Sequence, residues 1–242
     1  LLLLVAVALA GMMLIPAGTS LPIHWGISGA ADRFLPRDAA LLLLPLIALF
    51  TVALLALAPR LAGREQAGTA RAAIRVILPA ILALFLAIEI ATVLIGMGQA
   101  VDMVRLVVLS LGLVFVNIGF VLPGVQPNLV VGIRLPWTLR DPANWRATHR
   151  LAGGLLVAGG LAMSLAALLT GSPAVLLGVS AVGVLVPVVT ALLHSWRNAR
   201  RRTSCRNTAP APPKRRSKRA PMRSIRACGW MRIRPPCGWR GS

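Results

Sequence analysis

Six long apolar stretches constrain this sequence more than any other feature. Crossing a bilayer as a helix takes about 20 apolar residues at about 1.5 Å of rise per residue. Continuous rather than alternating apolar runs favour helices over a β-barrel. We therefore predict an all-α fold, a polytopic transmembrane bundle with six spans. The predicted spans cover residues 1–17, 39–58, 76–95, 104–122, 151–170 and 174–194.

The composition excludes a soluble protein with a charged surface. Hydrophobic residues make up 57% of the 242 residues, and charged residues make up only 13%. An average soluble domain has about 25% charged residues. The high hydrophobicity also excludes a disordered chain, so the body of the protein is expected to lie in a membrane.

The predicted spans and loops divide the chain into three units. Residues 1–58 form a two-helix unit around an outer loop at 18–38, and residues 59–196 form a four-helix region with a cytoplasmic loop at 123–150. Residues 197–242 form a basic tail. The first helix is short, and we interpret it as truncated; a cleaved signal peptide is the alternative.

Arginines in the loops orient the bundle. Residues 59–75 carry four arginines against one acid, and residues 123–150 carry four arginines against one acid. The 18–38 loop is balanced, and residues 171–173 are uncharged. Because positively charged loops stay in the cytoplasm, we predict that both termini are cytoplasmic and that the 18–38 loop lies outside.

The tail differs completely from the body in composition. Residues 195–242 hold 15 Lys or Arg and no acid. The tail also holds the three cysteines, whose spacing matches neither a metal site nor a CxxC motif. Two functional interpretations are a segment lying on anionic lipid and a nucleic-acid arm. The interpretation that we prefer is a disordered or frameshifted, low-complexity end, so we assign it no function.

The outer loop at 18–38 has too many Gly and Pro residues for a helix. Ile23 and Trp25 flank His24, which favours a short extended piece, and Trp25 and Phe34 suit the membrane interface. His24 is a candidate ligand or proton-linked group; the alternative is a histidine bonded to the loop backbone. A single histidine makes a poor metal site, and we expect neither a metal nor a cofactor.

The cytoplasmic loop ends in a predicted helix. Asp141 followed by Pro142 is typical of an N-cap and the first helical position. The helix would place Trp145 and His149 one turn apart on one face and continue into the fifth span. We expect Trp137 and Trp145 at headgroup level and the loop arginines on lipid phosphates or loop carbonyls. The alternative is that this loop is only a positively charged anchor.

The two loops also carry runs of residues at a distinctive spacing. The cytoplasmic run is Pro127, Asn128, Gly132, Arg134, Pro136, Trp137, Thr138, Trp145, Thr148, His149 and Arg150. The outer run is Pro22, His24, Gly29 and Asp32. The cytoplasmic run resembles the signature of the SdpI immunity family, and the outer run resembles an N-terminal domain that often precedes it. That domain more often has Phe where this chain has Trp25, and the resemblance covers about residues 1–195.

The resemblance implies a multi-pass protein of the bacterial cell membrane that gives immunity to a secreted antimicrobial peptide toxin. It also implies a receptor role, in which a cytoplasmic autorepressor is held at the membrane once toxin is bound. The expected partners are the lipid bilayer, a peptide toxin outside and a transcriptional repressor inside. We expect no direct nucleic-acid binding, and the oligomeric state stays open.

Glu89 is the only acid inside a predicted span, where an ionised carboxylate costs about 2.5–3.5 kcal/mol or more. It is either a proton- or substrate-linked site or a buried hydrogen-bonded acid, with Asn117 as a candidate partner at a poorly matching depth. The alternative function is therefore a small proton-linked transporter or exporter, although no pair of broken helices supports it. A membrane enzyme ranks last, because no nucleophile, metal set or phosphate-binding glycine loop accompanies the candidate acid–base pairs.

Single cysteines test the predicted orientation. The three native cysteines are replaced by serine, and one cysteine is then introduced in 59–75 or in 18–38. A membrane-impermeant thiol reagent added to whole cells should label the 18–38 cysteines and leave the 59–75 cysteines unlabelled. Labelling of 59–75 from outside would show that the arginine distribution does not orient this bundle.

Overall fold

Long helices make up most of the protein in the computed structural model, which describes residues 1–61, 64–128 and 130–208. Within these residues, five helices are long and apolar enough to cross a membrane. They are α2 (Arg37–Leu61), α3 (Arg64–Gly96), α4 (Met103–Val121), α6 (Pro142–Leu169) and α7 (Pro173–Thr208). The multi-pass helical architecture is thereby confirmed.

The first predicted span forms a shorter helix than the other five. α1 (Leu2–Leu14) has 13 residues, which at about 1.5 Å per residue reaches about 20 Å. The hydrocarbon core of a bilayer is about 30 Å thick. The described residues therefore hold five helices of spanning length and one short apolar helix, rather than six full spans.

The outer loop folds as a β-hairpin, so the prediction of an all-α fold is wrong at this segment. Strands β1 (Ser20–Trp25) and β2 (Ala31–Pro36) pair antiparallel, with Leu21 opposite Leu35. A two-stranded hairpin is marginal on its own, and this one is supported by the fully buried Leu21, which joins a core cluster with Ile15 and Leu41. The short extended piece expected around His24 is part of β1.

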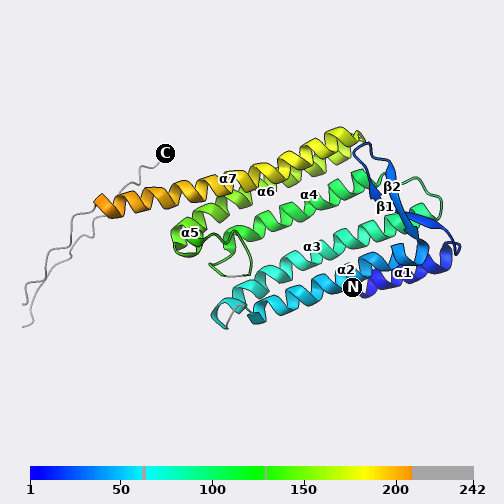
Figure 1. The fold of residues 1–242 in the computed structure, drawn as a ribbon, viewed down its shortest axis with the longest axis horizontal. Helices are drawn as coiled ribbons and strands as arrows, with labels where there is room; N and C mark the ends of the chain where they lie inside the picture. Colours follow the sequence, from blue (N-terminus) through cyan, green and yellow to red (C-terminus); the bar gives the residue numbers. More distant parts are fainter. Residues whose placement is uncertain (62–63, 129, 209–242) are drawn as a thin grey trace, which may run out of the picture.

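The helices form a bundle with the hairpin at one end and the α4–α6 connection at the other (Figure 1). α6 packs between α4 and α7, α3 packs against α4, and α1 and α2 pack on α3. We call the two ends the hairpin end and the loop end. The hairpin tip lies against the start of α7, because a Cβ atom on Gly29 would lie 2.7 Å from Pro173 Cγ.

Glycines allow α4 and α6 to approach backbone to backbone. A Cβ atom on Gly112 would lie 2.6 Å from the carbonyl oxygen of Gly160, and one on Gly119 would lie 2.7 Å from that of Gly153. No real Cβ atom can be accommodated at that separation without a backbone shift. Small residues at such crossings are the usual means of close packing between membrane helices.

Arginines bond the exposed carbonyls of helix ends at the hairpin end. Arg37 donates from Nη1 to the carbonyl oxygen of Ile15, 2.6 Å away, at the end of α1. Arg105 donates to the carbonyl oxygens of Ala167 and Leu168 at the end of α6. The last carbonyls of a helix have no partner within it, and a nearby cation also complements the helix dipole. These contacts fix the helix ends relative to one another.

The sixth predicted span continues beyond its expected end. α7 extends through residues 197–208, which were assigned to the tail. Residues 209–242 lie outside the described part of the chain, so their interpretation stays a prediction.

Candidate functional site

The predicted cytoplasmic motif folds into a compact cap at the loop end of the bundle, which we call the inner cap (residues 122–128 and 130–149). It contains the 3-10 turn η1 (Leu122–Gly124), the short helix α5 (Pro136–Leu139) and the first two turns of α6. Five motif side chains are almost fully buried in it. They are Asn128, Thr138, Trp145, Thr148 and His149.

Asn128 holds the first turn of the inner cap. Its Oδ1 accepts hydrogen bonds from the backbone N–H groups of Val130 and Val131, at 2.8 and 2.7 Å. Its Nδ2 donates to the carbonyl oxygens of Gln126 and Val131, at 2.8 and 3.2 Å. Both ends of the side-chain amide are engaged by the backbone, so Asn128 shapes the loop rather than offering a free group to a ligand.

His149 joins the loop to α6. Its Nδ1 donates to the carbonyl oxygen of Trp145 at 2.8 Å, and its Nε2 accepts from the backbone N–H of Ile133 at 3.0 Å. This pair of bonds assigns the neutral tautomer that carries its proton on Nδ1. Both ring nitrogens are occupied and the side chain is fully buried, so His149 acts as a structural bridge.

Trp145 stacks on His149, with ring centroids 4.0 Å apart and an interplanar angle of 19°. The prediction that these two residues share one face of a helix is confirmed. The indole N–H donates to the carbonyl oxygen of Val125 at 2.7 Å. The side chain of Trp145 is fully buried, so it packs within the protein, and its expected position at headgroup level stays a prediction.

Gly132 is required between Asn128 and His149. Its φ of 110° lies in a region that side-chain-bearing residues rarely adopt. A Cβ atom at this position would also collide with Nε2 of His149. The chain passes closely over the imidazole ring here, and this approach allows the next backbone N–H to reach the histidine.

Thr138 and Pro136 begin helix α5. The hydroxyl of Thr138 accepts from the backbone N–H of Leu135 at 3.0 Å and donates to the carbonyl oxygen of Ile133 at 2.8 Å. Pro136 occupies the first turn, where its missing N–H leaves no hydrogen bond unmade. Ile133 is thus bonded through its N–H to His149 and through its carbonyl to Thr138.

Residues of the cap also bond to α7 through Ser195, which was not among the predicted site residues. Trp137 donates from Nε1 to the hydroxyl of Ser195 at 3.0 Å, and Asn144 donates to the carbonyl oxygen of Ser195 at 2.9 Å. Thr148 donates to Oδ1 of Asn144 at 3.2 Å. The spacing of four residues between Asn144 and Thr148 is a local signal that could have indicated the hydrogen bond between these two side chains. Nothing in the sequence around Ser195 indicates its role.

The predicted start of α6 is confirmed. Asp141 is the N-cap and accepts from the backbone N–H of Ala143 at 3.0 Å, with Pro142 as the first helical residue. The helix then runs without a break to Leu169. Asp141 also forms a 3.0 Å ion pair with Arg202 of α7, which ties the cap to α7 a second time.

The outer candidates lie together in the hairpin, at the end of the bundle opposite the inner cap (Figure 1). Nδ1 of His24 and Oδ1 of Asp32 lie at hydrogen-bond distance, 2.6 Å apart, and the two side chains are 56% and 49% exposed. The alternative of a bond from His24 to loop backbone is therefore wrong, because its partner is a carboxylate. Pro22 lies opposite Phe34 in the hairpin, and Gly29 adopts a φ of 81° in the turn.

Glu89 lies in α3 with its side chain fully buried. Among the described residues, neither of its carboxyl oxygens has a hydrogen-bond partner, and the same holds for Oδ1 of Asn117. Among these residues, Asn117, the candidate partner at a poorly matching depth, does not bond Glu89. Val93, one turn further along α3, packs against Gly11 of α1, so this face of α3 is directed toward α1.

Metal ligands do not cluster in the described part of the chain. No group of three or more His, Cys, Asp and Glu residues there could hold a metal ion.

Comparison with known proteins identifies the segment that contains the inner cap. Residues 124–191 match the model of the SdpI/YfhL protein family. This segment belongs to the SdpI/YfhL family. The match begins inside the cap and extends along α6 into α7, so the asparagine, glycine, tryptophan and histidine that build the cap lie within the family region.

A distantly related protein supports the same family relationship. The chain is 28% identical over 109 residues to immunity protein SdpI of Bacillus subtilis (strain 168), which covers 45% of this chain and 52% of that protein. The chain therefore spans about half the length of the curated relative that it matches. No solved structure matches the chain.

Two glycines that differ in their surroundings test the geometry of the SdpI-family cap. Gly132→Ala should lower the free energy of unfolding by about 1–3 kcal/mol, because a strained φ and a clash with His149 both oppose the new methyl group. Gly154 lies within helix α6, and no atom lies within 4 Å of a Cβ added there. Gly154→Ala should therefore raise the free energy of unfolding by up to about 1 kcal/mol.

Denaturant titration of the purified protein in mild detergent measures both changes. Equal effects of the two substitutions would contradict the close passage of the loop over the imidazole ring.

Proposed function

We propose that this protein is a bacterial membrane protein that gives immunity to a secreted antimicrobial peptide toxin. The observation that carries the proposal is the family match of residues 124–191, the segment that builds the inner cap. The matched relative is named an immunity protein. Because the match spans about half of that relative, its role is transferred here as a proposal about the whole chain.

The proposed orientation places the inner cap in the cytoplasm and the hairpin outside. The basis is the excess of arginine in residues 59–75 and 123–150 and the charge balance of 18–38. In this arrangement α1 belongs to a sixth crossing, and both termini lie in the cytoplasm.

The hairpin is the proposed contact for the toxin. Ile27 at its tip is 86% exposed and Phe34 on β2 is 53% exposed. Exposed apolar side chains of this kind commonly mark protein or membrane contacts. A two-stranded hairpin also leaves outer strand edges to which an extended peptide can add by backbone hydrogen bonds.

The inner cap is the proposed contact for a cytoplasmic regulator. Its buried polar groups are taken up by internal hydrogen bonds, so recognition falls to its exterior. Arg140, Arg146 and Arg150 are exposed there, and they offer a basic surface to an acidic partner.

Protection of a sensitive host tests the immunity proposal. Cells that lack immunity and express the full chain should survive a sporulation-delaying-type peptide toxin that kills cells carrying the empty vector. Ile27→Asp should reduce the tolerated toxin concentration by on the order of tenfold, because a charge at the hairpin tip removes an apolar contact.

Gln99→Asp is the matched control, since it adds an acid at another exposed position of the hairpin end. It should leave protection intact. Immunoblots of membranes must show equal amounts of each variant. Death of cells with a normal membrane content of the unaltered chain would reject immunity to this toxin.

A small proton-linked transporter is the second proposed function, and Glu89 is the observation that favours it. Ionisable residues within membrane spans commonly serve ion or substrate pathways, and this acid has no hydrogen-bond partner among the described residues.

Proton flux tests the transporter proposal. Vesicles that contain the purified chain and a pH-sensitive dye should show protein-dependent proton movement, which Glu89→Gln abolishes and Glu89→Asp retains. Equal flux with glutamine at this position would remove the support for this function.

A further inference from the structure

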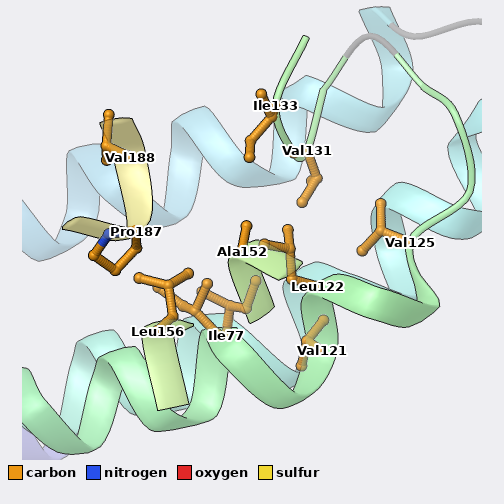
Figure 2. Close-up of a pocket in the computed structure, with 12 residues that line it drawn as sticks. Ile77, Val121, Leu122, Val125, Val131, Ile133, Ala152, Leu156, Pro187 and Val188 are labelled. Atoms are coloured by element: carbon orange, nitrogen blue, oxygen red, sulfur yellow. The ribbon is translucent and has the colours of Figure 1, made fainter. Parts of the chain in front are cut away.

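An apolar cavity lies directly beneath the inner cap (Figure 2). Its volume is about 240 Å³, and it is partly open to the outside of the bundle. The cap provides one wall through Val131, Gly132 and Ile133, and the other walls come from α3, α4, α6 and α7. Figure 2 shows Ile133 and Val131 above the space, with Leu156 of α6 and Pro187 of α7 beside it.

The polar network of the cap fixes the wall that the loop contributes. Asn128 holds Val131 through its N–H and its carbonyl. His149 holds Ile133 through its N–H. The same residues that resemble the family signature therefore determine the shape of an apolar space, although none of their polar atoms needs to face a ligand.

The surroundings of the cavity favour an acyl chain as its occupant. Its lining side chains are apolar, so water would find no hydrogen-bond partners in it. Most of the lining residues belong to helices of spanning length, and Val188 of α7, one of them, is 49% exposed, so we expect membrane lipid at the opening. Lipid chains are the apolar material present there at high concentration.

The charge at the loop end favours an anionic headgroup above that chain. Asp141, an acid at this end, already pairs with Arg202. Basic sites between membrane helices on the cytoplasmic side commonly bind anionic lipid headgroups, and guanidinium groups bind phosphate through paired hydrogen bonds. Exposed arginines at this end include Arg71, Arg75, Arg140, Arg146 and Arg150.

We propose that the protein binds an anionic phospholipid, with one acyl chain in the cavity beneath the inner cap and the phosphate on the arginines of the loop end. A bound chain supports the wall formed by residues 131–133 and so stabilises the cap. This inference goes beyond immunity or transport, and it stands or falls on lipid binding alone.

Two adjacent valines on α7 provide the test. Val188 lines the cavity and Val189 does not, while the two side chains are 49% and 48% exposed. Val188→Phe fills the mouth of the cavity, and Val189→Phe adds the same bulk outside it. Both positions are open enough to accept the larger ring without disturbing a core.

The full chain is purified in detergent, stripped of lipid and titrated with phosphatidylglycerol or phosphatidylcholine, and bound lipid is measured by native mass spectrometry. The unaltered chain should prefer phosphatidylglycerol by on the order of tenfold, as expected for about two arginines near the phosphate. Val188→Phe should weaken phosphatidylglycerol binding by on the order of tenfold, since it displaces about two methylenes of the chain. Val189→Phe should bind like the unaltered chain.

Three outcomes would overturn the proposal. Equal phosphatidylglycerol binding by Val188→Phe and Val189→Phe would show that the acyl chain does not lie in the cavity. Equal binding of phosphatidylglycerol and phosphatidylcholine would show that the site does not select an anionic headgroup. A dimer in light scattering that Val188→Phe dissociates would assign the cavity to a second copy of the chain.

Discussion

The two hydrogen bonds of the His149 ring hold the loop end of this protein together. One ring nitrogen bonds α6 through the carbonyl of Trp145, and the other bonds the loop through the N–H of Ile133. A buried backbone N–H that loses its partner costs about 1–3 kcal/mol. The glycine conformation at 132, the stacked indole and the cavity wall all depend on the loop lying across this ring.

The parts of the fold that follow from local chemistry could be predicted from the sequence. Continuous apolar runs locate the long helices, because a membrane requires every backbone polar group in a span to be bonded within it. Asp141 followed by Pro142 locates the start of α6, because a cap and a pre-set φ act within one turn. Helical periodicity in the same way predicts that Trp145 and His149, four residues apart, lie on one face of α6.

The parts that depend on contacts between distant segments could not be predicted. The hairpin of residues 20–36 is stabilised by Leu21 packing against α1 and α2, and its Gly and Pro content by itself favours turns. Ser195 bonds Trp137 and Asn144 across more than fifty residues of chain. Trp145 looked like an interfacial residue by type, but its burial is decided by the loop that folds over it.

The contacts of α7 have a mechanical consequence. Its first residue lies against the hairpin tip at Gly29, and Ser195, in its second half, bonds the inner cap. A helix is stiff along its axis, so α7 rigidly connects the hairpin with the inner cap. Pro187 lies inside this helix, where it removes one rung of the hydrogen-bond ladder and adds compliance. Pro187 also lines the cavity, so the weakened turn of α7 lies beside the space beneath the cap.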